Sequence, residues 1–274
     1  MIDPVKLNFI TGGQKRRKLA LCLGALERDM VSGGSCVCSG LPRAEYLRKI
    51  IAVILEDPAL PPDAAAEIRG LCESVPFDER RACNTARNHL LALIGARPAE
   101  WDLIIAPHPP AGEGGRKFFP GVFVYAEDIR SPFNLGSIFR TAEALGAEKL
   151  FLSPLCCPAD HPRAKRAAMG CVETLPYERL PLEALPQDLP VFALETGGEP
   201  LGDFAFPQRG ALIVGNEELG VSPQALGRAT SGPVTIPLRG AKGSLNVSVA
   251  LGIALNAWVS RKNVGLGRRS LPKS

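Results

Sequence analysis

Several polar and charged residues follow short apolar segments in the second half of the sequence. Asn134 and Arg140 follow one such segment, Glu217 follows a second, and Ser244 and Asn246 follow a third. A guanidinium group can pair bidentately with a phosphate or a carboxylate, and neighbouring amide, hydroxyl and carboxylate groups can orient a reacting hydroxyl. Each residue taken alone also has a structural interpretation, as a helix cap, a turn residue or a solvated charge.

Two glycine-containing segments also follow short apolar segments. Glu195, Thr196, Gly197 and Gly198 follow the apolar segment 190–194, where the glycines either form a simple turn or let the backbone approach a ligand. Neither this segment nor the later Gly-Asn-Glu sequence has the G-x-G-x-x-G spacing of a dinucleotide site. The sequence therefore argues against a Rossmann cofactor site.

Short apolar runs rich in β-branched and aromatic residues predict the strands that hold these residues. Helical stretches separate most of the runs, and this alternation predicts a mostly parallel sheet with helices on both faces. In such α/β sheets, ligands bind at the carboxyl ends of the strands, which is where the polar residues lie. The predicted strands are 122–126, 149–154, 190–194, 211–215 and 234–238.

The first hundred residues have a different pattern. Apolar residues there recur at the spacing of amphipathic helices, so residues 1–105 predict a helical N-terminal domain. Residues 106–117 are rich in proline and glycine and predict a linker. We expect an α/β domain over 118–262 and a basic tail over 263–274.

The composition excludes several classes of protein. The chain has 274 residues, 46% of them hydrophobic, and its net charge of +4 lies entirely beyond residue 115. The eight cysteines include no C-x-x-C pair, and the three histidines show no metal-ligand spacing, so we expect reduced thiols and no metal. We found no secretory leader and no apolar run long enough to span a membrane, and we expect a cytoplasmic protein.

Three segments, in order, resemble the three motifs of the SpoU/TrmH family of RNA ribose 2′-O-methyltransferases in the SPOUT superfamily. They are NLGSIFRTAEALGA, IVGNEELGVS and IPLRGAKGSLNVSVALGIAL, and the resemblance covers about residues 118–262. It implies a trefoil knot at the C-terminal end of the α/β domain, S-adenosylmethionine as cofactor, an RNA substrate and a homodimer that completes the site. The expected catalytic residues are Asn134, Arg140, Glu217, Ser244 and Asn246.

The same resemblance implies the residues that bind the cofactor. They are Leu194, Glu195, Thr196, Gly197, Gly215, Asn216, Glu217, Ile236, Leu238 and Leu245. Basic residues near the motifs are candidate RNA contacts or, equally, solvated surface charges; they are Arg163, Lys165, Arg166, Arg239 and Lys242. The helical N-terminal domain departs from the family's common N-terminal domain, which is of a ribosomal-protein-like α/β type.

We therefore expect transfer of a methyl group to a ribose 2′-hydroxyl in tRNA or rRNA. Two alternatives remain open: methylation of a base nitrogen by the same fold, and a non-catalytic RNA-binding protein. The sequence does not specify which RNA or which nucleotide is modified.

Overall fold

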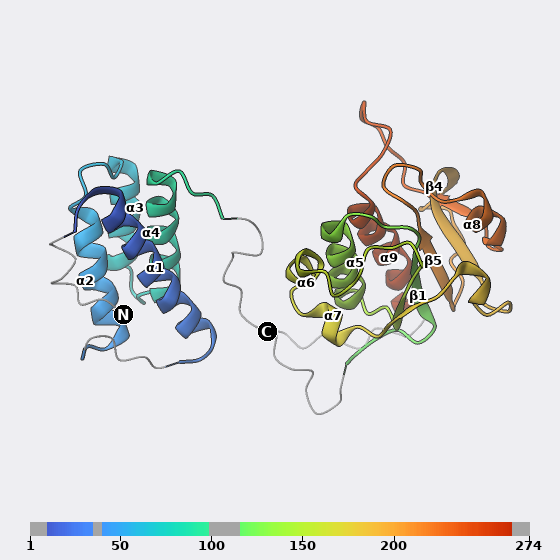
Figure 1. The fold of residues 1–274 in the computed structure, drawn as a ribbon, viewed down its shortest axis with the longest axis horizontal. Helices are drawn as coiled ribbons and strands as arrows, with labels where there is room; N and C mark the ends of the chain where they lie inside the picture. Colours follow the sequence, from blue (N-terminus) through green and yellow to red (C-terminus); the bar gives the residue numbers. More distant parts are fainter. Residues whose placement is uncertain (1–9, 35–39, 99–115, 265–274) are drawn as a thin grey trace. The chain divides into compact units, whose positions relative to one another are not determined.

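The computed structural model describes residues 10–34, 40–98 and 116–264. The chain divides into two compact units, Met1–Pro110 and Ala111–Ser274, each of which is described by itself (Figure 1). Most of the expected linker 106–117 and tail 263–274 lies outside the described residues, so the expected domain boundaries stay predictions.

The first unit consists of four helices in the part of the chain that the structure describes. Their buried side chains form one apolar core, which includes Leu23, Leu26, Tyr46, Ile50 and Leu90. These positions recur at intervals of three and four residues, as the sequence pattern predicted. The helices are α1 (Gly12–Val31), α2 (Arg43–Leu55), α3 (Pro62–Glu73) and α4 (Glu79–Leu93).

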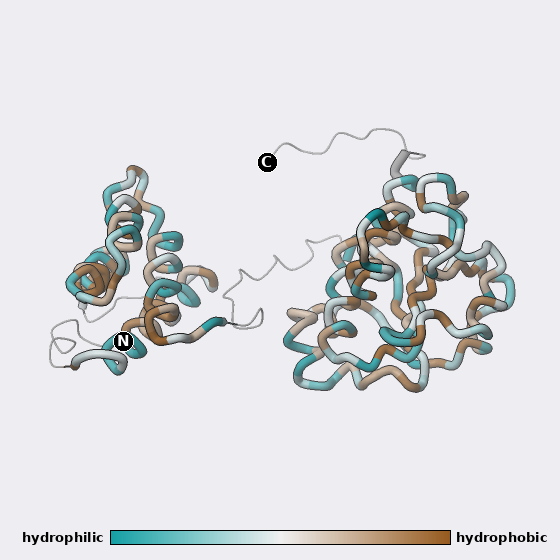
Figure 2. Tube along the Cα trace, turned by 90° about the horizontal axis from the view of Figure 1, so that it is seen from above, coloured by the Kyte–Doolittle hydropathy of each residue, from teal (hydrophilic) through white to brown (hydrophobic). Residues whose placement is uncertain are grey.

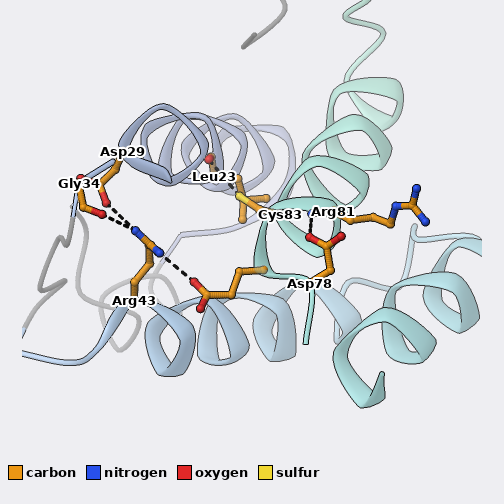
Figure 3. Close-up of polar contacts among 8 residues, drawn as sticks. Leu23, Asp29, Gly34, Arg43, Asp78, Arg81 and Cys83 are labelled. Atoms are coloured by element: carbon orange, nitrogen blue, oxygen red, sulfur yellow. Dashed lines mark hydrogen bonds and ion pairs between the residues drawn. The ribbon is translucent and has the colours of Figure 1, made fainter. Parts of the chain in front are cut away.

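Arg43 links three parts of the helical unit at the start of α2. Its guanidinium donates to the Asp29 carboxylate at 3.2 Å, to the Gly34 carbonyl at 2.6 Å and to Glu79 at 2.9 Å (Figure 3). The positive charge thus joins the end of α1 to the first residue of α4. A second pair, Glu27 with Arg87, is buried between α1 and α4 at 2.7 Å.

The second unit is a six-stranded sheet in which every recorded strand pair is parallel. The strand order is β3-β2-β1-β5-β4-β6, which confirms the mostly parallel sheet expected from the sequence. The strands are β1 (Val122–Ala126), β2 (Lys149–Leu152), β3 (Tyr177–Arg179), β4 (Val191–Pro200), β5 (Gly210–Val214) and β6 (Pro233–Thr235).

Helices cover both faces of this sheet, as predicted. One face packs against α5 (Pro132–Ala144), α6 (Pro162–Ala168), α7 (Cys171–Thr174) and α9 (Val247–Val264) around Phe139, Phe192 and Trp258 (Figure 1). The other face packs against α8 (Pro223–Arg228) and the 3-10 helix Leu182–Ala184. Residues of β1 and β5 alternate between the two cores, and hydrophobic segments run through the interior of the unit (Figure 2).

The structure corrects four local expectations. Strand β4 continues to Pro200, with a register shift between Leu194 and Glu199, where a tight loop was expected. Ser131, and not Asn134, caps α5, because the Ser131 hydroxyl accepts from the Asn134 N–H at 3.4 Å. The sequence also places Arg140 near the start of this helix, but Arg140 lies about two turns into α5.

The remaining two corrections concern the last helix and the sheet edge. The sequence predicts a helix that starts near Ser244 with Asn246 in its first turn, but α9 begins at Val247, so Ser244 and Asn246 precede it. The edge strand β3 was missed because its three residues are all exposed and show no apolar alternation. The trefoil knot implied by the family resemblance stays a prediction. Among the described helices, none combines the length and apolar character needed to cross a membrane.

Gly136 sets the distance between α5 and α6. A Cβ atom at this position would overlap the carbonyl oxygen of Ala164 and the methyl group of Ala167. The absence of a side chain therefore lets the backbone of α6 lie directly on α5, and this contact fixes where the first turns of α5 present Asn134.

We expect Gly136→Ala to lower the free energy of unfolding of this unit by about 1–3 kcal/mol, because α6 must move away. The control is Gly227→Ala in α8, where a Cβ atom meets no other atom within 4 Å and alanine should be neutral or stabilising. Urea unfolding followed by fluorescence of the buried Trp258, with Trp101 replaced by Phe, gives the comparison. Equal stability of the two variants would contradict the close approach.

Candidate functional site

The carboxyl ends of β4, β5 and β6 and the segment before α9 enclose a cleft of about 620 Å³. Parallel strands present their carboxyl ends at one sheet edge, so segments far apart in the sequence meet here. The volume falls within the range of about 300–1,000 Å³ typical of small-molecule sites. Four of the five expected catalytic residues line the cleft; they are Asn134, Glu217, Ser244 and Asn246.

Arg140 is the exception among the five. The cleft's lining does not include it, and its half-buried side chain lies near α7, where its charge acts on the Cys171 thiol. Burial raises the pKa of Cys171 and the Arg140 charge opposes that rise. The lining of the cleft thus brings together Asn134, Glu217, Ser244 and Asn246 without Arg140.

Glu217 is the acceptor on which the polar side of the cleft is built. Its Oε1 accepts from the Asn134 side chain and from the Ser131 N–H, both at 2.9 Å, and its Oε2 accepts from the Arg130 N–H at 3.0 Å. Partial burial alone would raise the pKa of Glu217, but these hydrogen bonds outweigh it and the pKa is lowered from its ordinary value. The carboxylate is thus ionised and ties the loop after β5 to the start of α5.

The hydrogen-bond chain continues from Asn134 to α9. The Asn246 Nδ2 donates to the Asn134 Oδ1 at 2.9 Å, while the Asn246 Oδ1 accepts from the backbone and side chain of Ser248 at 3.0 and 2.7 Å. Asn246 therefore caps α9 and shapes the cleft at the same time. This double role explains why an asparagine stands before a helix that is otherwise mostly apolar.

The turn after β5 is closed by its own backbone and by Asn216. Asn216 and Gly220 exchange two backbone hydrogen bonds of 3.0 Å, and the Asn216 side chain donates to the Asp128 carbonyl at 2.7 Å. Gly215 has no room for a side chain, because a Cβ atom there would overlap the Gly220–Val221 backbone. The Gly-Asn-Glu sequence is thus required by a compact turn that presents Glu217.

Glu195 holds the same turn from the side of β4. Its Oε2 accepts from the Val221 N–H at 2.9 Å and its Oε1 accepts from the Thr196 N–H at 2.7 Å. Nine of the ten expected cofactor residues line the cleft, and Gly197 does not. The apolar part of the lining comes from Leu194, Ile236, Leu238 and Leu245.

The candidate RNA-contact residues lie outside the lining of the cleft. The guanidinium of Arg163 lies 5.9 Å from the ring centre of Phe133, next to Asn134 in the chain, and Lys165 pairs with Glu173 at 3.3 Å. Arg239 and Lys242 are exposed on the segment between β6 and α9. Among the described residues, no group of His, Cys, Asp and Glu side chains could hold a metal ion.

Sequence reasoning missed the part of the site that comes from the loop after β1. Asp128 has a left-handed backbone with φ of 52°, its Oδ1 accepts from the Ser153 hydroxyl at 2.5 Å, and its carbonyl receives Asn216. The turn at Asp128 directs the Arg130 and Ser131 N–H groups toward Glu217. The strand-end rule applied to the segment after 122–126 would have pointed to this loop, but nothing in the sequence marks a left-handed aspartate.

Comparison with known proteins identifies the family of the chain. Residues 121–256 match the model of the SpoU rRNA Methylase family. A 23S rRNA (adenosine(1067)-2′-O)-methyltransferase of Streptomyces azureus is 33% identical over 207 residues, which cover 72% of this chain and 75% of that protein. The chain belongs to the SpoU methylase family.

Other relatives of this SpoU-family chain match over shorter regions. The ribosomal RNA small subunit methyltransferase G 2 of Syntrophobacter fumaroxidans is 33% identical over 141 residues, which are 51% of this chain and 28% of that protein. The solved structure of the SpoU methyltransferase AviRb from Streptomyces viridochromogenes has 28% identity and a TM-score of 0.49, covering 54% of this chain and 63% of that one. The chain thus spans less than two thirds of both these relatives.

We expect Glu217→Gln to destabilise the second unit by about 1 kcal/mol at neutral pH, since an amide cannot accept all three hydrogen bonds of the carboxylate. The lowered pKa of Glu217 means that its contribution is complete above the ordinary value of 4.5 and is lost as the pH falls through the folded-state pKa. The difference between wild type and variant, measured by urea unfolding, should therefore shrink on acidification.

The neighbouring Glu218→Gln is the matched control for this measurement. Glu218 makes an ion pair with Arg130 at 3.0 Å, but both side chains are largely exposed, and such pairs contribute little. A Glu217→Gln effect that equals the Glu218→Gln effect, or that grows toward acid pH, would contradict the assignment.

Proposed function

We propose that this chain transfers a methyl group from S-adenosylmethionine to a ribose 2′-hydroxyl of tRNA or rRNA. The observation that carries the proposal is the cleft itself, where three family motifs meet at the carboxyl ends of parallel strands. Relatives named as 2′-O-methyltransferases act on rRNA in Streptomyces azureus and Bacillus subtilis and on tRNA in Beijerinckia indica. Whether the substrate is tRNA or rRNA stays open.

The donor set of the cleft fits S-adenosylmethionine. Leu194, Ile236, Leu238 and Leu245 would offer apolar surface for a flat heterocycle, and carbonyl oxygens of the 215–220 turn would be available as hydrogen-bond acceptors. The ionised Glu217 would contribute a negative potential that favours a positive sulfonium in this cleft. When bound, the cofactor supplies a methyl group that is already activated by the sulfonium charge.

The protein's own contribution is to position the acceptor hydroxyl. Asn134, Glu217, Ser244 and Asn246 fix the polar wall, and Arg140 holds a phosphate next to the ribose so that the 2′-oxygen faces the methyl group. The oxygen–carbon bond forms as the carbon–sulfur bond breaks, and the hydroxyl loses its proton. A guanidinium stays protonated at ordinary pH, so a phosphate oxygen or a water molecule accepts this proton.

A homodimer through the second unit is part of the proposal. Arg140 does not line the cleft of its own chain, and α9 exposes Val249 and Ile253, one turn apart, at 52% and 41% of their surface. Covering this apolar pair with a second copy buries it and brings a second Arg140 within the assembly. In this arrangement, each cleft receives the arginine of the partner subunit.

Alkaline hydrolysis of the product tests the reaction. After incubation with methyl-labelled S-adenosylmethionine and unmodified tRNA or rRNA transcripts, the label should appear in alkali-resistant dinucleotides, because a methylated 2′-oxygen cannot attack the adjacent phosphodiester. Label found in mononucleotides instead would move the acceptor to a base. Cofactor binding without any labelled product, also on ribosomal particles, would favour a non-catalytic RNA-binding protein.

Arg140→Ala should lower methyl transfer by at least about a hundredfold and leave cofactor affinity within a few-fold of wild type. The physical reason is loss of phosphate positioning without loss of any residue that lines the cleft. Single-turnover methyl transfer and calorimetric cofactor titration measure the two effects, and Arg209→Ala, which removes an exposed arginine paired with Asp188, is the control for loss of one positive charge. Near-normal turnover of Arg140→Ala would disprove the role.

Mixing two inactive variants tests whether the arginine acts across the dimer. The Arg140→Ala protein is mixed with the Gly215→Val protein, whose cleft is blocked. If one subunit donates the arginine and the other binds the cofactor, the mixed dimers should recover part of the activity. No recovery despite proven subunit exchange would show that the arginine acts within its own chain.

A further inference from the structure

A second cleft lies within the helical unit, between α1 and α4, with a volume of about 480 Å³. Its floor is apolar and consists of Ala20, Leu21 and Gly24 from α1, Leu91 from α4 and Ile94 directly after α4. These residues repeat at helical spacing along the facing sides of the two helices. Leu21 is 69% exposed although it stands among buried neighbours of the same helix, so the core leaves an apolar surface open to solvent here.

Arginines form the edges of this cleft. Arg17, Arg28, Arg87 and Arg97 all line it, and no acidic side chain does. Arg17, Arg28 and Arg97 are exposed, and no ion pair is recorded between any of them and another described residue. The cleft therefore combines an apolar floor with a concentration of positive charge, although the charges of residues 1–115 sum to zero.

The fourth arginine is fixed in position by a buried carboxylate. Arg87 is 9% exposed and donates to the Glu27 Oε2 at 2.7 Å, while the Glu27 Oε1 accepts from Asn84 at 2.9 Å. Both oxygens of Glu27 are thus engaged within the unit. A held guanidinium is better prepared to bind an anion than a mobile one, because less side-chain entropy is lost on binding.

Gly24 makes room between these arginines. It stands in the middle of α1, where glycine is destabilising relative to alanine, and a Cβ atom there would lie 3.6 Å from the Arg28 Nη1 and 3.7 Å from the Arg87 Nε. Those are ordinary contact distances, so packing alone would accept alanine. The glycine instead deepens the floor directly beneath two guanidinium groups.

We propose that the α1–α4 cleft binds a single-stranded segment of the RNA substrate, an inference that rests on the proposed function. Guanidinium groups pair bidentately with phosphates and also stack on bases, and an apolar floor accepts the flat face of an unpaired base. Charge complementarity favours a polyanion, and the apolar floor favours one that carries bases. The cleft gives the helical unit the role of an RNA-contacting module.

The test compares two double variants of the full chain that lose the same charge. The cleft variant is Arg17→Gln with Arg28→Gln, and the control is Arg69→Gln with Arg81→Gln. Arg69 is exposed on α3, and Arg81 is exposed on α4. Both doubles keep a helix-favouring residue at each position, so circular dichroism should show equal helix content.

The probe is a fluorescein-labelled uridine dodecamer, titrated at several salt concentrations. The cleft double should bind it at least about fivefold more weakly than the control double. Its log–log salt slope should also be smaller in magnitude by about 1.4, from about 0.7 for each lost phosphate contact on single-stranded RNA. Equal affinities and equal slopes for the two doubles would overturn the proposal.

A third variant tests the apolar floor. Leu21→Gln keeps the charge and alters a largely exposed side chain, and it should weaken the uridine dodecamer but not an abasic oligomer of the same length. Equal binding of both oligomers by wild type would overturn a base-binding floor. The proposal would also be overturned if the Arg17→Gln, Arg28→Gln variant bound RNA as tightly as the control double but differed from it in the molecular mass measured by sedimentation. That result would identify a second protein chain as the occupant of the cleft.

Methyl-transfer kinetics separate this inference from the proposed function. The cleft double should raise the KM for RNA and leave kcat unchanged. If wild type methylates ribose and the cleft double matches the control in KM, the cleft inference fails alone. If wild type transfers no methyl group to any ribose while the dodecamer result holds, the proposed function fails and the RNA-binding cleft stands.

Discussion

The site depends on one ionised carboxylate that accepts hydrogen bonds from elements far apart in the sequence. Glu217 stands after β5, yet its donors come from the loop after β1 and from the first turn of α5. Through Asn134 and Asn246 the same carboxylate reaches the start of α9. A hydrogen bond to a charged acceptor is stronger than one between neutral groups, so this centre can hold several loops in register. Strand ends alone would bring the loops near one another without fixing them.

Close backbone contacts in the surrounding elements hold Glu217 and its donors in place. Gly136 lets α6 lie against α5, and Gly215 lets the turn after β5 fold back on itself. Asp128 adopts a left-handed backbone, which a non-glycine residue seldom does, and so aims two N–H groups at Glu217. Backbone donors have no side-chain freedom to lose, so they hold Glu217 in place at little entropic cost.

Much of this arrangement could be predicted, because local patterns determine it. Apolar runs indicated five of the six strands, and motif resemblance indicated the residues of the cleft. The parts that escaped prediction depend on tertiary geometry: the exposed edge strand β3, the continuation of β4 to Pro200, and the backbone donors of Arg130 and Ser131. Arg140 was expected beside Asn134, but six residues along a helix place a side chain on a different side and nearly two turns away.

The orientation of the hydrogen-bonded side-chain amides of Asn134 and Asn246 has a consequence at acid pH. Asn134 can donate to Glu217 and accept from Asn246 in one orientation of its side chain. Protonation of Glu217 leaves one of its two oxygens able to accept, but a proton on Oε1 would turn the acceptor that faces Asn134 into a donor, and the Asn134 amide would then reverse to receive it. Reversal would present its NH2 group to the NH2 group of Asn246, whose oxygen caps α9. A proton on this oxygen would thus reverse two linked amides, from the turn after β5 to the last helix, and would loosen the polar wall of the cleft and the start of α9 together.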